Sequence, residues 1–128
     1  MEYRTRIKVC GITESEDARV VVAAGADGLG FIFVPQSPGY METNRVREIT
    51  VEMPPRVNAL GVFVDEELKV VEEIIHYCGL SVIQLHGSET PEYCDNISCQ
   101  VVKSFAIHPA TKSDDLAPYA KFVNGFLL

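Results

Sequence analysis

Residues 28–34 read GLGFIFV, and residues 35–40 continue with PQSPGY. An apolar run without a charged residue is typical of a strand that is covered on both faces, as the strands of a parallel sheet are. The two prolines and the glycine that follow predict a loop directly after this strand. We therefore expect a buried parallel strand whose carboxyl end leads into a loop.

The same pattern extends along the chain in both directions. Further short apolar runs predict strands at residues 6–10, 57–64, 81–85, 100–105 and 125–128. Amphipathic segments between them predict helices at residues 15–24, 43–49, 66–76, 90–97 and 114–119. Strands that alternate with short helices indicate βαβ units and a parallel sheet. Residues 1–128 are expected to form one domain, either a doubly wound open sheet or part of a (β/α)₈ barrel, because a complete barrel needs about 200 residues or more.

The composition argues against several classes of partner. Eleven Lys and Arg residues against eighteen Asp and Glu residues give a net charge of −7, which disfavours general binding to nucleic acid or to anionic membranes. The apolar runs are far shorter than the ~20 residues that cross a bilayer, and we expect no secretory leader in the first residues, which lack an apolar stretch. The four cysteines include no CxxC pair and no zinc-ligand spacing, so we expect reduced thiols, no metal site and a cytoplasmic protein.

Residues with chemistry in parallel α/β folds lie at the carboxyl ends of the strands. In and around the predicted strands, the chain carries KVCGIT at residues 8–13, AGADGLGFIF at 24–33, PQSP at 35–38, GVFV at 61–64, QLHG at 84–87 and VKSF at 102–105. In this order the motifs closely resemble those of the phosphoribosylanthranilate isomerase family, and the resemblance covers nearly the whole chain. It implies the (β/α)₈ TIM-barrel fold, here an incomplete barrel of about five and a half βα units.

The resemblance implies a specific reaction without a cofactor. Members of the family catalyse the Amadori rearrangement of N-(5′-phosphoribosyl)anthranilate to 1-(2-carboxyphenylamino)-1-deoxyribulose 5-phosphate, a step of tryptophan biosynthesis, with no metal and no organic cofactor. A general acid protonates the furanose ring oxygen, the ring opens to a Schiff base, and a general base removes the proton from C2′. The expected partner is therefore a small phosphorylated substrate, with no nucleic acid and no membrane.

The motifs contain candidate site residues. The resemblance assigns the general base to Cys10, and a thiol beside a cation or a helix N-terminus has the lowered pKa that this role needs. The alternative is a buried, inert cysteine. The resemblance also implies that His86 contacts the substrate or the catalytic residues, and the alternative is a capping or loop histidine. Gln84 lies two residues earlier on the same predicted strand, so it is expected to point the same way as His86 and to belong to the same substrate-binding site.

Other polar residues are expected to be structural. Asp65 is expected to cap the helix that begins at residue 66, and His76 to complement the dipole at the end of that helix. Lys103 is expected to be solvated or ion-paired rather than to face the barrel interior.

The chain departs from the family pattern at Gly39, in the loop after the second predicted strand. The family carries an arginine at that place, and this arginine binds the anthranilate carboxylate. Losing one charge-assisted contact costs about 1.5–3 kcal/mol, or about ten- to a hundredfold in affinity or rate. Gly39 is therefore expected to weaken substrate binding unless a neighbouring residue compensates.

A second departure concerns the general acid, which in the family is an aspartate directly after the sixth strand. Residues 126–128 read FLL and correspond to the positions just before it. The family's phosphate site lies in still later loops, beside a helix N-terminus. Residues 1–128 are therefore expected to hold the base without the acid or the phosphate site, and to be inactive alone. The open sheet edges of such a half-barrel favour self-association or completion by another chain.

Two other interpretations stay open on the sequence alone. A non-catalytic half-barrel that self-associates or binds a small ligand would keep the motifs as remnants, and Gly39 together with the missing acid favours it. An open flavodoxin-like sheet of independent function would need an anion-binding loop after the first strand, where residues 10–13 offer few backbone amides.

Overall fold

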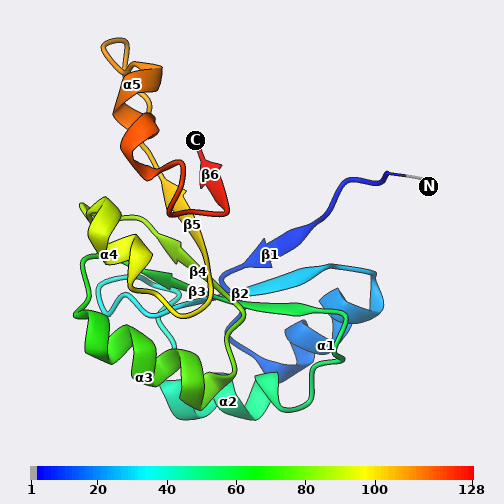
Figure 1. Ribbon diagram of the computed structural model, residues 1–128. Helices are drawn as coiled ribbons and strands as arrows, with labels where there is room; N and C mark the ends of the chain where they lie inside the picture. The colour runs from blue at the N-terminus through cyan, green and yellow to red at the C-terminus, as the bar shows by residue number, and fades with distance from the viewer. Residues whose placement is uncertain (1–2) are drawn as a thin grey trace.

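The computed structural model describes residues 3–128 and contains strands that alternate with helices (Figure 1). The strands are β1 (Lys8–Cys10), β2 (Gly28–Ile32), β3 (Asn58–Phe63), β4 (Val82–Leu85), β5 (Gln100–Ser104) and β6 (Gly125–Leu127). The helices are α1 (Ser15–Ala23), α2 (Thr43–Thr50), α3 (Leu68–Cys78), α4 (Pro91–Asp95), α5 (Ser113–Leu116) and the 3₁₀ turn η1 (Ala117–Tyr119). The expected strands and helices are all present, each within about two residues of its predicted range, so this part of the prediction is confirmed.

All strands run parallel, and their order in the sheet is their order in the chain, β1-β2-β3-β4-β5-β6. In a doubly wound sheet, the chain at one point returns to the first strand and adds later strands on its other side. In a barrel, each new strand is added on the same side as the one before. The interpretation as an open flavodoxin-like sheet is therefore wrong, and the incomplete (β/α)₈ barrel is confirmed.

The sheet is strongly curled. In a flat sheet β1 and β4 would lie three strand spacings apart, about 14 Å, and side chains that stand perpendicular to the sheet would not bridge that gap. Instead, Nζ of Lys8 on β1 donates a hydrogen bond to Oε1 of Gln84 on β4 at 2.5 Å. The two side chains therefore meet across a concave inner face.

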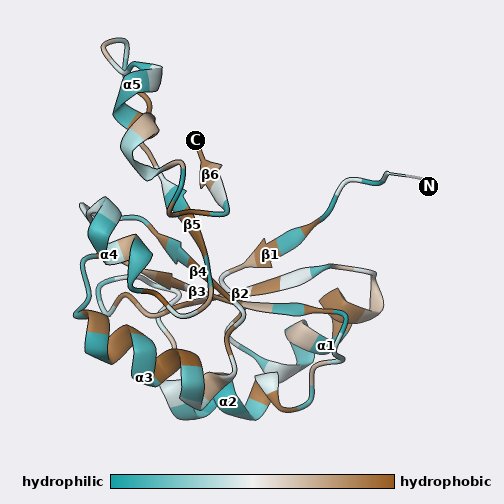
Figure 2. Ribbon diagram, viewed as in Figure 1, coloured by the Kyte–Doolittle hydropathy of each residue, from teal (hydrophilic) through white to brown (hydrophobic). Residues whose placement is uncertain are grey.

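The convex face of the sheet packs against helices. In Figure 1, α1, α2 and α3 gather along this face, below the strands. Phe31 and Phe63 are fully buried, and the rings of Phe33 and Phe63 stack with their centroids 5.1 Å apart. Figure 2 shows apolar and polar residues alternating along α3, which buries Val71 and Ile75. The hydrophobic core therefore lies between sheet and helices, and the concave face remains available for polar residues.

Within residues 3–128, β1 and β6 each pair with another strand on one side only, as expected for a half-barrel. In β6, Phe126 and Leu127 expose 37% and 43% of their surface, and Leu128, directly after the strand, exposes 73%. A strand edge with free backbone groups and exposed apolar side chains favours pairing with a further strand.

Candidate functional site

Cys10 ends β1 at the carboxyl edge of the sheet, and the residue is exposed. Its partner on β2 is Gly30, where a Cβ atom would lie only 2.9 Å from Sγ of Cys10. The missing side chain at Gly30 thus gives the thiol room on the concave face. Beyond the thiol, Gly11 turns the chain with a φ of 80°, a left-handed conformation that favours glycine. The amides of Gly11 and Ile12 both donate to the carbonyl of Gly30, at 3.0 and 3.2 Å, which fixes the turn against β2.

The other cysteines are less accessible. Cys78 and Cys94 are buried, and Cys99 is partly buried. Burial raises the pKa of Cys78 to about 11 and the pKa of Cys99 to about 11, and it also raises the pKa of Cys94. A thiol acts as a nucleophile or base only as the thiolate. Of the four cysteines, Cys10 is therefore the one whose exposure and place at a strand end suit such a role.

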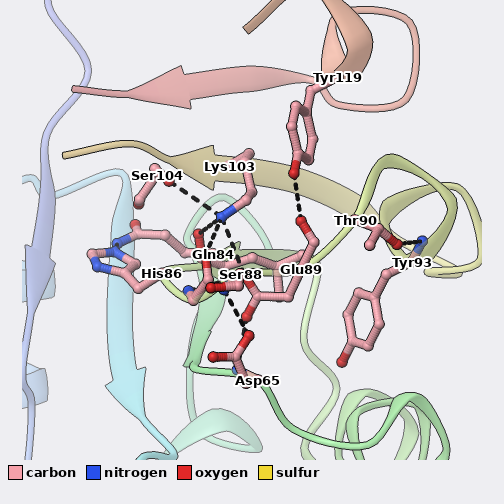
Figure 3. Close-up of polar contacts among 12 residues, drawn as sticks. Asp65, Gln84, His86, Ser88, Glu89, Thr90, Tyr93, Lys103, Ser104 and Tyr119 are labelled. Atoms are coloured by element: carbon pink, nitrogen blue, oxygen red, sulfur yellow. Dashed lines mark hydrogen bonds and ion pairs between the residues drawn. The ribbon is translucent and has the colours of Figure 1, made fainter. Parts of the chain in front are cut away.

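Gln84 on β4 and His86 just beyond it point the same way, as expected (Figure 3). Gln84 exposes 5% of its surface, and its Nε2 contacts Nε2 of His86. His86 itself is exposed at the carboxyl edge. Its pKa is lowered below the ordinary 6.5, first by partial burial of the ring and then by the cations of Lys8 and Lys103, against an opposing effect of Glu89. The imidazole is therefore neutral around neutral pH.

A buried ion pair joins Lys103 of β5 to Glu89 in the loop after β4 (Figure 3). The Nζ and Oε1 atoms are 3.2 Å apart, and the residues expose 2% and 4% of their surface. Nζ also donates to the carbonyls of Gly87 at 2.7 Å and Ser104 at 3.2 Å. The carboxylate of Glu89 accepts the amides of Gly87 at 2.9 Å and Asp65 at 2.8 Å. The pair thereby ties together the carboxyl ends of β3, β4 and β5.

Of the two states expected for Lys103, the ion pair is confirmed and the solvated state is wrong, because the side chain is buried. The partner of the ion pair was not predicted. Glu89 lies in a short loop, and no spacing in the sequence marks it as a buried acid. The one available signal is indirect: a lysine inside a strand that is covered on both faces needs an acid nearby, because an unpaired buried charge is very costly.

Asp65 does not cap a helix, so that prediction is wrong. Helix α3 begins two residues later than expected, at Leu68, with Glu67 at the N-cap position. Asp65 instead has a φ of 50°, a conformation that aspartate tolerates better than most residues, and its Oδ1 accepts the amide of Ser88 at 2.6 Å. The residue joins the loop after β3 to the loop after β4, and its carboxylate is therefore not free to start a helix.

Gly39 lies in the loop between β2 and α2. Its amide donates to Oγ of Ser37 at 3.2 Å, and the next residue, Tyr40, pairs with Ile32 at the end of β2. Its φ is not left-handed, so the backbone does not require glycine here. The nearest atom to a Cβ at this position would be Cδ1 of Ile32 at 3.1 Å, the mobile end of a side chain. The loop can therefore accept a larger residue, including the arginine of the family pattern.

One further candidate, His76, lies away from this edge of the sheet. His76 is in the last turn of α3, where its Nε2 is 3.7 Å from the carboxylate of Glu72, in keeping with a structural role. Residues 3–128 contain no group of His, Cys, Asp and Glu side chains arranged to hold a metal ion. Over the same residues, every helix is too short or too polar to cross a bilayer.

Comparison with known proteins identifies a family along almost the whole chain. The sequence model described as N-(5′phosphoribosyl)anthranilate (PRA) isomerase matches residues 7–128. A curated N-(5′-phosphoribosyl)anthranilate isomerase from Citrifermentans bemidjiense is 43% identical over 124 residues, which cover 97% of this chain and 59% of that protein. The chain thus spans less than two thirds of the curated relatives that it matches.

Solved structures of the same family resemble this chain in fold. Phosphoribosyl anthranilate isomerase from Thermotoga maritima superimposes with a TM-score of 0.88 at 35% identity, over 98% of this chain and 63% of that one. A second structure has the same TM-score at 37% identity, over 96% of this chain and 66% of that one, and holds reduced 1-(o-carboxyphenylamino)-1-deoxyribulose 5-phosphate. Because the family's sequence model covers residues 7–128 and the same curled sheet recurs in solved members, this chain belongs to the phosphoribosylanthranilate isomerase family.

Proposed function

We propose that this chain supplies the general-base side of the active site of a phosphoribosylanthranilate isomerase, which acts on N-(5′-phosphoribosyl)anthranilate in tryptophan biosynthesis. The observation that carries the proposal is the exposed residue Cys10 at the carboxyl end of β1, whose thiol occupies the space that a side chain at Gly30 would take. The related structure that holds a reduced form of a carboxyphenylamino-deoxyribulose phosphate supports a small phosphorylated substrate. The cytoplasmic location expected from the sequence stays a prediction.

In this proposal Cys10 acts after the sugar ring has opened. Protonation of the furanose oxygen breaks its bond to C1′ and leaves a protonated Schiff base, C1′=N⁺–H, between C1′ and the anthranilate nitrogen. The Cys10 thiolate then takes the proton from C2′, the electrons of that C–H bond form a C1′–C2′ double bond, and the electrons of the C1′–N double bond move to nitrogen. The resulting enolamine tautomerises to the ketone. A well-placed general base contributes about 10²–10⁴-fold to such a reaction.

The remaining contacts from this chain come from β4 and from the loop after β2. His86 presents an imidazole at the carboxyl edge, and Gln84 holds it from below. Gly39 leaves the anthranilate carboxylate without the arginine of the family pattern, so we expect weaker binding than in a chain that has it. The general acid and the phosphate-binding loops lie outside residues 3–128 in this proposal, in a region that the longer relatives possess or in a second chain.

Loss of the substrate's fluorescence during turnover tests the proposal. The chain is assayed alone and mixed with a fragment of the Citrifermentans bemidjiense relative that begins after the matched region, and sedimentation measures whether the two assemble. We expect turnover from the assembled mixture and none from either piece. Cys10→Ala should reduce the rate at least about 10²-fold. Cys99→Ala, which removes a partly buried thiol before β5, should leave the rate unchanged. Turnover that survives Cys10→Ala contradicts the assignment of the base.

The non-catalytic half-barrel remains the second candidate. The one-sided pairing of β1 and β6 and the exposed side chains of Phe126 and Leu127 favour self-association through the sheet edges. This candidate predicts a dimer or larger species of the chain alone, and no turnover even in a mixture that has assembled.

A further inference from the structure

Three polar side chains form a connected row on the concave face, and one of them is not part of the proposed chemistry. Lys8 of β1 donates through Nζ to Oε1 of Gln84 at 2.5 Å, and Nε2 of Gln84 contacts Nε2 of His86. Lys8 is partly buried and Gln84 is buried, so water competes little for the hydrogen bond between them. The row runs from the interior of the half-barrel to its carboxyl edge, where His86 lies.

The hydrogen-bonding capacities along the row leave one assignment. A lysine ammonium has only donors, so the Gln84 atom that faces Lys8 is the amide oxygen. The amide nitrogen of Gln84 therefore faces His86, and this nitrogen also has only donors. Nε2 of His86 has to accept. A histidine whose Nε2 accepts a hydrogen bond is neutral and carries its proton on Nδ1.

We propose that Lys8 is a positioning residue: through Gln84 it fixes His86 as the neutral imidazole with its proton on Nδ1, so that Nδ1–H is the donor offered to a bound ligand. Within residues 3–128, Nδ1 of His86 has no hydrogen-bond partner, so this donor is available. The matching ligand atom is an acceptor oxygen, such as a carboxylate or a sugar hydroxyl of the substrate. That last step rests on the proposed isomerase function, whereas the position of the proton does not.

The charged surroundings of His86 agree with a neutral ring. Lys8 approaches from β1 and Lys103 from β5, and the cations of both lower the pKa of His86 in addition to the effect of burial. Glu89 opposes them, but its carboxylate is already engaged by Lys103 and by backbone amides. The imidazolium form would also place a donor of its own against the donor of Gln84. Charge and hydrogen bonding therefore both favour the same neutral ring.

Long-range ¹H–¹⁵N NMR spectra of the histidine rings test the proposal on the chain itself, without substrate. The chain has three histidines, and a His86→Asn variant assigns the signals of His86. We expect a protonated Nδ1 and a bare Nε2 at neutral pH, with this form in about three- to tenfold excess over the other tautomer. A His86 ring that is protonated on Nε2 overturns the proposal.

Variants separate the role of Lys8 from general effects of substitution. Gln84→Glu replaces the donor facing His86 by an acceptor, so the proton should move to Nε2. Lys8→Met frees the amide of Gln84 to rotate, so the excess of the Nδ1–H form should be lost, whereas Lys8→Arg, which also has only donors, should retain it. Lys69→Met, at an exposed position on α3, is the matched control and should change nothing.

The outcomes remain informative if one variant does not fold. If Lys8→Met is unfolded, the unsubstituted chain and Gln84→Glu still decide the tautomer and the role of the amide. A tautomer that is the same in the unsubstituted chain, in folded Lys8→Met and in Gln84→Glu refutes the positioning role. Failure of the isomerase proposal is distinguishable, because it would appear in the turnover assay with Cys10→Ala and would leave the ring spectra unchanged.

Discussion

Replacing Lys103 by methionine removes a buried cation and leaves its acid in place. Lys103 and Glu89 expose 2% and 4% of their surface, and their charged atoms are 3.2 Å apart. Methionine fills a similar volume without charge, so the Glu89 carboxylate would keep the amides of Gly87 and Asp65 but lose the ammonium. Breaking a buried pair in this way costs about 3–5 kcal/mol. Since a chain of this size has a free energy of unfolding of about 5–15 kcal/mol, we expect Lys103→Met to lose about a fifth of it or more.

Urea unfolding followed by far-ultraviolet circular dichroism measures this loss. With an m-value of about 2 kcal/mol per molar urea, a loss of about 4 kcal/mol lowers the midpoint by about 2 M. Lys69→Met on the exposed side of α3 is the control and should stay within about 0.5 kcal/mol of the unsubstituted chain.

A double-mutant cycle with Glu89→Gln isolates the pair itself. The neutral glutamine makes no ion pair, so the second substitution should cost much less in the Lys103→Met background than in the original chain, with a coupling energy of about 2 kcal/mol. Additive effects, or a loss below about 1 kcal/mol for Lys103→Met alone, would refute the reasoning that this pair holds the three strand ends together.

Three further outcomes are expected. Gly39→Arg should tighten binding of the reduced product analogue about ten- to a hundredfold in the assembled enzyme, measured by calorimetry, because the side chain of Ile32 can move aside and a charge-assisted contact returns. Since folding lowers the pKa of His86, its contribution to stability should be complete above about pH 6.5 and should be lost as the pH falls from there through the folded-state pKa, which unfolding at several pH values would show. Iodoacetamide at pH 8 should label Cys10 first, since a thiol of pKa about 11, such as Cys99, is thiolate in roughly one molecule per thousand at that pH, and mass spectrometry of the labelled peptides checks the order.

The elements of the fold were predictable because each strand has the composition that its surroundings require. Residues 28–34 form an apolar run because most of β2 is buried: one face of the strand packs against helices, and the other faces the inside of the half-barrel. The bounds were less accurate than the elements, since the last residues of a strand depend on hydrogen bonds to its neighbours. The order of the strands did not follow from the pattern, because a doubly wound sheet and a barrel share the same alternation of strands and helices.

The sequence indicated which residues lie at the carboxyl ends of strands, but not the contacts that those residues make. The strand-end rule marked Cys10, Gln84 and His86 as candidates, because a parallel sheet brings the carboxyl ends of its strands to one edge. Their roles came from the family resemblance and stay predictions. The bond between Lys8 and Gln84 was not found, since it joins residues 76 positions apart and exists only because the sheet curls. Glu89 and Asp65 were missed or misassigned for a related reason: their partners are backbone amides in other loops, and the sequence does not show which loops are adjacent.

The sequential order of the strands also bears on how the chain folds during its synthesis. Each new strand finds its place beside the strand made just before it, so β1, β2 and β3 can join as they leave the ribosome. Lys8 has to wait for Gln84, which is made 76 residues later, or about 4–15 s at ordinary rates of translation. The hydrogen bond across the half-barrel, and with it the orientation of His86, therefore comes late, after the sheet has acquired its curvature. Substitutions at Lys8 are accordingly expected to leave the early assembly of the strands intact and to change only the finished site.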